Sequence, residues 1–145
     1  MRPKTPLLAA DVIVSLEDYP GSPIVLIERK NPPYGWAIPG GFVDLGERME
    51  EAAIREMREE ISLEVRLELL LGLYSDPSRD PRGHTVTAVY IGKAHGEPKA
   101  ADDAKSTGIF TLDILPSPLA FDHVHILQDY RHFLETGKVA PLRFV

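Results

Sequence analysis

The chemistry that this sequence can perform is concentrated in residues 40–65, GGFVDLGERMEEAAIREMREEISLEV, where carboxylates recur at helical spacing. On a helix of 100° per residue, Glu56, Glu59 and Glu60 share one arc beside an apolar arc. Glu56 and Glu60 are four residues apart, and like charges at that spacing destabilise a helix. A hard divalent cation reverses this effect, because Mg²⁺ and Mn²⁺ prefer carboxylate oxygens. The stretch therefore predicts a metal site on one helix face.

A simpler interpretation is a solvated acidic face whose carboxylates pair with Arg55 and Arg58. The residues before the helix favour the metal site. Gly40 and Gly41 let the backbone pass close to a ligand, and Gly46 adds a second flexible point. A glycine loop that enters the helix can direct a backbone carbonyl toward the same cation.

The elements that must position this helix lie on both sides of it in the sequence. Apolar runs and two-residue alternation predict strands at 7–16, 24–29, 63–74, 85–94 and 109–115. Apolar residues at spacings of three and four predict helices at 47–61 and 123–135. This order, without repeats or an internal linker, predicts a mixed sheet covered by helices in a single domain, residues 1–145.

Composition excludes several classes of protein. The 145 residues contain 16 basic and 22 acidic side chains, a net charge of −6, which argues against general binding to nucleic acids. There is no cysteine, so disulfides and thiolate metal sites are excluded. No apolar run reaches the ~20 residues that span a membrane, and the N-terminus lacks the core of a signal peptide. We therefore expect a cytoplasmic protein that binds neither nucleic acid nor membrane.

The spacing of Gly41, Glu47 and the run Arg55-Glu56-Met57-Arg58-Glu59-Glu60 resembles the Nudix box of the Nudix (MutT-like) hydrolases. It departs at Ser62, where the family usually has a glycine that ends the helix in a left-handed turn. The resemblance implies an α/β (α+β) fold, the Nudix-type α/β/α sandwich, with a mixed sheet packed between helices. Gly41 and Glu47 would be structural, with Glu47 bridging to the arginine of the motif.

The resemblance also implies roles for the remaining residues of the box. Glu56, Glu59 and Glu60, helped by the Gly40 backbone carbonyl, would bind Mg²⁺, with Mn²⁺ as the alternative. Arg55 would belong to the catalytic set by holding a glutamate in place. Family members cleave a nucleoside diphosphate linked to another moiety, by attack of a metal-activated water on phosphorus.

Further motifs resemble the ADP-ribose pyrophosphatase-like branch of this family, namely TPLLAADVIV, IVLIERKNPPYGWAIPGGFVDLGE, YSDPSRDPRGHTVTAVY and LAFDHVHIL. This resemblance implies a nucleotide-sugar substrate, hydrolysis of ADP-ribose to AMP and ribose 5-phosphate, and a homodimer. Two alternatives stay open. One keeps the chemistry for other nucleotides, such as oxidised nucleoside triphosphates or dinucleoside polyphosphates. The other is a non-catalytic sensor that binds a nucleotide sugar.

Candidate substrate contacts lie outside the box. Arg79 and Arg82 flank the turn in RDPRGH, and arginine suits a bidentate grip on phosphate. The alternative is a connecting loop in which Asp80 pairs with an arginine. Arg29 ends a predicted strand and is a candidate to reach the pocket. Trp36 is a candidate for stacking on a base, with packing in the core as its alternative.

A general base would complete the site. Asp102 and Asp103 in AADDAKSTG are candidates, with Asp103 included in the predicted catalytic set and a turn or cap as the alternative. Many relatives have a glutamate shortly after such a pair, where this chain has Ser106. We expect Asp122 to cap the last helix and His123 to be structural, with a role in the pocket as the alternative for this group.

Overall fold

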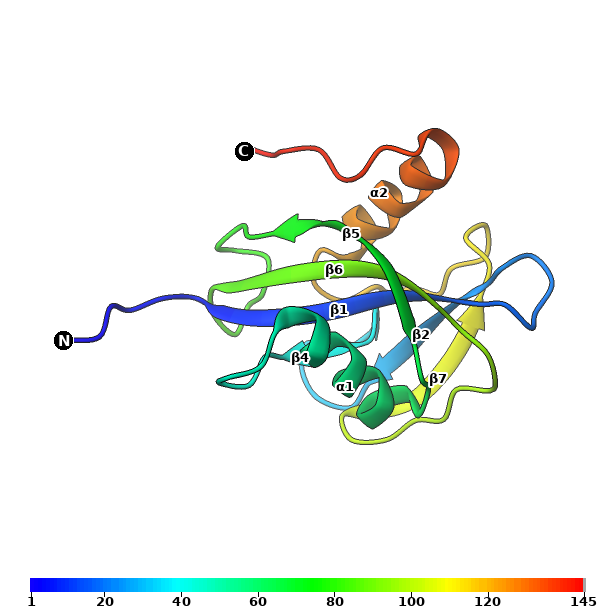
Figure 1. Cartoon of the computed structure of the whole chain (residues 1–145), viewed down its shortest axis with the longest axis horizontal. Helices are drawn as coiled ribbons and strands as arrows, with labels where there is room; N and C mark the ends of the chain where they lie inside the picture. The colour runs from blue at the N-terminus through cyan, green and yellow to red at the C-terminus, as the bar shows by residue number, and fades with distance from the viewer. Residues whose placement is uncertain (145) are drawn as a thin grey trace.

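The chain forms a mixed sheet with two helices, and the computed structural model describes residues 1–144 (Figure 1). In chain order the elements are β1 (Leu7–Leu16), β2 (Ile24–Arg29), β3 (Trp36–Ala37), β4 (Gly40–Phe42), α1 (Met49–Ile61), β5 (Arg66–Tyr74), β6 (Thr85–Ala94), β7 (Ala104–Phe110) and α2 (His123–Thr136). The predicted mixed sheet between helices is confirmed. No helix within residues 1–144 is long and apolar enough to cross a bilayer.

Strand β1 is the centre of the sheet, because three partners use its two edges. β6 pairs with it in parallel along its whole length. On the other edge, β4 pairs antiparallel with residues 9–11, whereas β2 pairs further along at Ser15. β2 carries β7 and the short β3, and β5 pairs with β6. The strands on this edge therefore diverge beside Asp11, and the space that they leave is where the candidate site lies.

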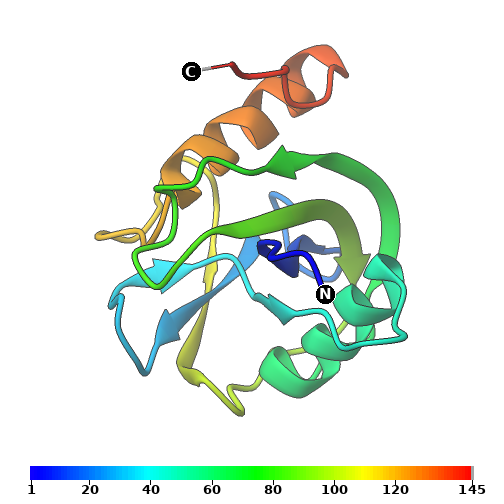
Figure 2. The ribbon, with the colours of Figure 1, turned by 90° about the vertical axis from the view of Figure 1, so that its left-hand side faces the viewer.

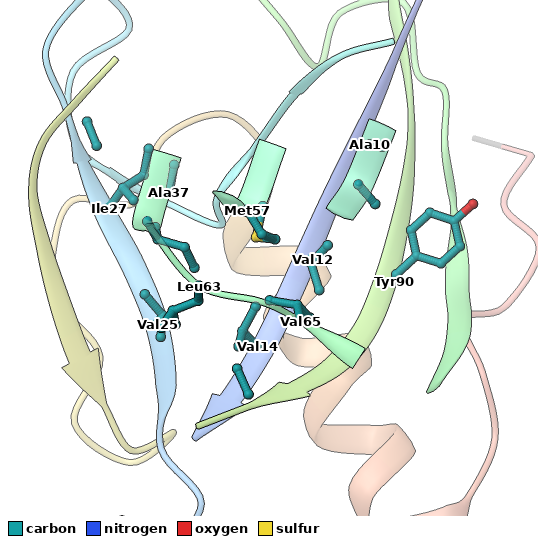
Figure 3. Close-up of a cluster of buried hydrophobic side chains, with 14 of the residues drawn as sticks. Ala10, Val12, Val14, Val25, Ile27, Ala37, Met57, Leu63, Val65 and Tyr90 are labelled. Carbon is teal, nitrogen blue, oxygen red and sulfur yellow. The ribbon is translucent and has the colours of Figure 1, made fainter. Parts of the chain in front are cut away.

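The two helices cover opposite faces of the sheet, each over its own apolar cluster (Figure 2). Successive residues of β1 divide between the clusters, as strand geometry requires: Val12 and Val14 belong to the α1 cluster and Ile13 to the α2 cluster. Figure 3 shows Met57 of α1 among the side chains of the first cluster. Full burial of such a side chain contributes about 1.5–3 kcal/mol, so this packing fixes α1 against the sheet.

The ends of α1 are set by local hydrogen bonds. Near its start, the Arg48 amide donates to the Glu51 carboxylate at 3.1 Å, so the helix begins at Met49, slightly later than predicted. At its end, Ser62 takes the left-handed conformation (φ 60°) and its amide bonds to the Met57 carbonyl. Serine thus adopts the turn for which the family uses glycine, at some cost in backbone strain.

Two strand boundaries differ from the prediction. The last strand was predicted at residues 109–115, but β7 runs from Ala104 to Phe110 and pairs with β2. Residues 104–108, AKSTG, lack apolar alternation, so only the pairing with a buried neighbour reveals them as a strand. β5 likewise begins at Arg66, later than the predicted start at residue 63.

Candidate active site

A cavity of about 250 Å³ lies where the strands beside β1 diverge. Its wall carries carboxylates, guanidinium groups and aromatic rings from elements far apart in the sequence. The charged residues of the wall are Asp11, Asp44, Glu56, Glu60, Asp80, Asp103, Arg29, Arg79 and Arg82. A wall with both signs of charge can bind an anionic ligand and a cation together.

Glu60 is the most buried carboxylate of α1, with only 5% of the residue exposed. Its Oε1 atom accepts a hydrogen bond from the Gly40 amide at 2.9 Å. Burial, opposed by this hydrogen bond and reinforced by the charges of Asp11 and Glu56, raises the pKa of Glu60 to about 8. Without a metal the carboxyl group is therefore mostly protonated at neutral pH, and a bound cation would replace that proton.

Two consecutive glycines admit two carboxyl groups to the cavity wall. A β-carbon on Gly41 would collide with the carboxyl group of Glu56. A β-carbon on Gly40 would collide with Oδ1 of Asp11 and with the carbonyl of Ala10. Neither glycine has a positive φ, so close approach, and not backbone conformation, explains why both are glycine.

Arg55 organises the exposed side of the acidic helix. Its guanidinium donates to Glu47 at 2.7 and 2.9 Å, to Glu56 at 2.9 Å, to Glu59 at 3.1 Å and to the Phe42 carbonyl at 3.0 Å. The hydrogen bond with Glu47 raises the pKa of Arg55 and lowers that of Glu47 to about 2. Arg55 therefore bridges to Glu47 and holds two of the predicted metal ligands at once. Glu59 stands at this exposed side and is not part of the cavity wall.

Arg79 lines the cavity, but its hydrogen bonds are made within the protein. Nε and Nη2 grip the Asp122 carboxylate at 3.0 and 2.9 Å, and Nη1 donates to the Thr87 hydroxyl at 2.6 Å. This geometry favours a positioning role over the grip on an anionic ligand that the sequence predicted. Asp122 does precede α2, but its side chain makes no capping hydrogen bond, because its carboxylate binds Arg79.

Arg29 and Arg82 both stack on the ring of Phe121, with guanidinium carbons 4.8 and 5.3 Å from its centroid. Arg82 also pairs with Asp80 at 2.8 Å, the arrangement that the alternative interpretation of this loop described. Arg29 uses only Nε, which donates to the Pro33 carbonyl at 2.8 Å. Among residues 1–144, the two terminal amino groups of Arg29 have no hydrogen-bond partner, so they can bind a ligand.

The remaining predicted site residues divide between the cavity and the core. Asp103 lies in the cavity wall. Trp36 does not; it is half-buried and packs edge-on against Phe110 at a centroid distance of 5.2 Å, which agrees with its core alternative. Ser106, where many relatives have a glutamate, donates to Glu28 at 3.0 Å and also lies outside the wall.

Asp11 reaches the cavity without having been assigned to it from the sequence, whereas His123 lies in the wall as the alternative to its predicted structural role allowed. Asp11 is 8% exposed, and burial raises its pKa to about 7. The His123 Nδ1 atom accepts the Ile38 amide at 2.9 Å, and Nε2 lies 3.6 Å from Oδ2 of Asp11. Burial lowers the pKa of His123 to about 3, so the ring is neutral. The available signal was a lone carboxylate within the apolar run LLAADVIVSL.

The donors of the site fit a hard divalent cation. Within residues 1–144, no three acidic or histidine groups are already gathered into a complete metal site. Burial nevertheless raises the pKa of both Glu56 and Glu60, which shows that nearby protein groups do not compensate their negative charges fully. The groups that surround the cavity offer oxygen donors, which Mg²⁺ and Mn²⁺ prefer.

Comparison with known proteins decides the family. A family model described as the NUDIX domain matches residues 5–130. The chain belongs to the Nudix family. The acidic helix α1, with the glycines that precede it, is therefore the Nudix box of this chain, and Ser62 is a departure within a true member of the family.

Several Nudix relatives are linked to ADP-ribose by name. An ADP-ribose pyrophosphatase of Methanocaldococcus jannaschii is 48% identical over 128 residues, which cover 86% of this chain and 73% of the relative. The ADPR-responsive transcriptional repressor NtrR of Acinetobacter baylyi is 31% identical over 132 residues, which cover 86% of this chain but only 52% of the repressor. A solved structure of the Nudix domain of Shewanella oneidensis NrtR, complexed with ADP-ribose, has a TM-score of 0.78 and 27% identity, with 90% of each chain covered.

Proposed function

We propose that this Nudix protein hydrolyses the pyrophosphate bond of ADP-ribose, with the help of a divalent cation, to AMP and ribose 5-phosphate. The observation that carries the proposal is the cavity in which the buried Glu60 and the half-buried Glu56 of α1 share one wall with Arg29 and Arg82. Such a wall suits a ligand with two linked phosphates, because the arginines and the cation can divide the negative charge between them. The identity with the M. jannaschii pyrophosphatase supports ADP-ribose as the substrate.

The cation is assigned to Glu56, Glu59 and Glu60 with the Gly40 carbonyl, with Mg²⁺ as the expected metal and Mn²⁺ as the alternative. When bound, such a cation neutralises phosphate charge and lowers the pKa of a water molecule. Arg55 has a positioning role, because its hydrogen bonds to Glu56 and Glu59 set where these carboxylates stand.

Arg29 and Arg82 are assigned to the phosphates of the substrate. Arg29 has its terminal amino groups free among residues 1–144, and Phe121 supports both guanidinium groups by stacking. Arg79 is assigned to the ordering of the loop that carries Arg82, because its bidentate grip on Asp122 ties that loop to the start of α2. The two kinds of arginine thus have separate tasks.

Asp103 is the proposed general base, because it lies in the cavity wall and is exposed enough to meet a water molecule. In the proposed step, the water oxygen forms a bond to one phosphorus while the bond from that phosphorus to the bridging oxygen breaks. The proton of the water goes to Asp103, and the departing phosphate keeps the electron pair. Neither phosphorus is preferred in this assignment.

The partners in this proposal are small molecules. A nucleotide sugar is the expected substrate, and the net charge of −6 agrees with the expectation that nucleic acid is not a partner. The homodimer and the cytoplasmic location implied by the sequence stay predictions. Light scattering during size-exclusion chromatography would test the dimer.

The experiment that tests the proposal is turnover of ADP-ribose with Mg²⁺, with and without EDTA, with products separated by chromatography. We expect AMP and ribose 5-phosphate in equal amounts, and only when metal is present. Turnover of 8-oxo-dGTP or diadenosine polyphosphates in place of ADP-ribose would keep the chemistry and overturn the substrate. Turnover that persists in EDTA would overturn the metal assignment.

A second candidate is a sensor that binds ADP-ribose without cleaving it, and the similarity to the ADPR-responsive repressor favours it. The retained Glu56, Glu59 and Glu60 argue for the enzyme, because binding alone has little need for a full set of acidic residues. Calorimetry separates the two. Heat of binding from ADP-ribose without AMP in the reaction mixture would establish the sensor.

A further inference from the structure

Asp11 is a buried carboxylate for which the protein supplies no hydrogen bond. It lies in the central strand β1, is 8% exposed, and lines the cavity. Among residues 1–144, no donor forms a hydrogen bond with its side chain, and the nearest basic atom is Nε2 of His123 at 3.6 Å. Within the same residues, no fully buried side-chain oxygen or nitrogen atom lacks a partner, so the Asp11 oxygens are open to the cavity and can meet a group that binds there.

The surrounding groups do not neutralise Asp11. The His123 Nδ1 atom accepts the Ile38 amide, so the ring carries its proton on Nε2 and turns it toward Asp11 without a positive charge. Arg79 is the nearby cation, but its fork is engaged by Asp122. The negative charge of Asp11 is therefore available to a group that enters the cavity.

Asp11 also meets the Nudix box at its glycines. Its Oδ1 atom occupies the position next to Gly40 where a side chain would begin. The amide of the same Gly40 donates to Glu60. The adjacent Gly41 has the same relation to Glu56. Two glycines in a row thus admit one carboxyl group from β1 and one from α1 to the same wall.

We propose that Asp11 is a further carboxylate ligand of the divalent-cation site, in addition to the glutamates of the Nudix box. This inference rests on the proposed function, because it requires that the box binds a cation. It assigns β1, which lies outside the box, a direct part in binding the metal. The close approach of Asp11 is the reason that Gly40 must lack a side chain even though its φ is ordinary.

The test is a titration of the full-length protein with Mn²⁺, followed by the loss of the free-ion signal in electron paramagnetic resonance. Asp11→Asn keeps the shape and removes the charge. We expect its Kd for Mn²⁺ to rise about tenfold or more, with a melting temperature in EDTA equal to or above that of the wild type. Asp129→Asn is the matched control, because Asp129 is also 8% exposed but bonds to Tyr74 and Arg143. This control should melt earlier and keep the wild-type Kd.

Each other outcome has a definite meaning. If Asp11→Asn keeps the wild-type Kd while Glu60→Gln weakens binding, Asp11 is not a ligand and the metal assignment of the box stands. If Glu60→Gln also keeps the wild-type Kd, the metal site itself is wrong. If Asp11→Asn and Asp11→Ser both fail to fold where Asp129→Asn folds, Asp11 is structural and the inference is overturned.

Discussion

The protein buries two aspartates to the same extent and treats them differently. Asp129 of α2 is 8% exposed, and its carboxylate accepts hydrogen bonds from the Tyr74 hydroxyl at 2.8 Å and from Arg143 at 2.7 Å. Asp11 of β1 is equally buried, yet among residues 1–144 it receives none. The first arrangement is complete without a ligand, whereas the second becomes favourable when a cation enters.

The same contrast holds for the arginines of the cavity wall. Arg79 gives its fork to Asp122 and is 4% exposed in its side chain. Arg29 uses one nitrogen and leaves its terminal amino groups without a partner in the described part of the chain. Satisfied charges thus build the frame, and incompletely satisfied charges mark where substrate and metal are expected.

This contrast would be refuted most clearly if Glu60, a buried carboxyl group of α1 with a single hydrogen bond, were dispensable for activity. We expect Glu60→Gln to lower turnover of ADP-ribose by about 100-fold or more, because it removes a metal ligand. Its metal-free stability in urea should equal or exceed that of the wild type by about 1 kcal/mol, because glutamine is neutral in both states and avoids the cost of protonating the glutamate on folding. Glu64→Gln, on the exposed surface, is the control that should change neither property. Near wild-type turnover in Glu60→Gln would refute the metal assignment.

A smaller effect is expected from the arginine that holds the glutamates. Arg55→Lys keeps the charge but cannot bond to Glu47, Glu56 and Glu59 at once, because lysine lacks the planar fork. We expect kcat to fall by about tenfold to 100-fold and unfolding to require about 1–2 kcal/mol less. Arg58→Lys is the matched control, since Arg58 is exposed on the same helix. Equal kinetics for the two variants would show that Arg55 does not position the site.

Asp129, which is fully hydrogen-bonded within the protein, should affect stability and not activity. Asp129→Asn is expected to lower the free energy of unfolding by about 1–3 kcal/mol, because Arg143 and Tyr74 lose a charged partner, while kcat and KM stay unchanged. Tyr74→Phe removes one of the same bonds from the other side. The two changes should therefore be non-additive in a double-mutant cycle. A reduced kcat in Asp129→Asn with unchanged stability would contradict the purely structural role of Asp129.

The smallest effect is expected at the end of the Nudix helix. Ser62→Gly should raise the free energy of unfolding by up to about 1 kcal/mol, because glycine adopts the left-handed conformation without strain. Turnover should not change, since Ser62 is exposed and outside the cavity wall. Ser22 also has a positive φ but lies far from Ser62 in the sequence. Ser22→Gly is therefore the control that shows how much stability a glycine gains at such a φ outside the Nudix helix. A loss of stability in Ser62→Gly would show that its hydroxyl contact with Lys99 matters more than strain.

Local patterns made the acidic helix predictable, because helical spacing alone places Glu56 and Glu60 together beside an apolar face. The Gly40 and Gly41 pair was also recognisable, because the two glycines are adjacent in the sequence and come just before that helix. The position of Asp11 beside Gly40 was not predictable, because it depends on which strand pairs with Gly40, and that pairing joins residues about thirty positions apart. The bond between Arg79 and Asp122 spans 43 residues and left no mark in either local sequence.

A bound cation is expected to replace the protons held by the buried carboxyl groups. The pKa of Glu60 rises from 4.5 unfolded to about 8 folded, so the folded state binds more protons in this range and metal-free stability must fall as pH rises toward about 8. Asp11, with a pKa of about 7, adds to this fall. His123 has a folded pKa of about 3 and an ordinary value of 6.5, so its unfolded form binds more protons near pH 6.5 and opposes this fall there. Above about pH 7.5 the ring is neutral in both states and does not contribute.

The most direct measurement is the melting temperature from about pH 6.5 to about pH 8.5, with Mg²⁺ and with EDTA, for the wild type and Glu60→Gln. We predict that the wild type loses stability with rising pH in EDTA and recovers it in Mg²⁺, and that Glu60→Gln shows less of both effects. Two results would contradict the replacement of the Glu60 proton by a cation. One is a wild-type melting temperature that does not change with pH or Mg²⁺, and the other is equal stabilisation of the wild type and Glu60→Gln by Mg²⁺.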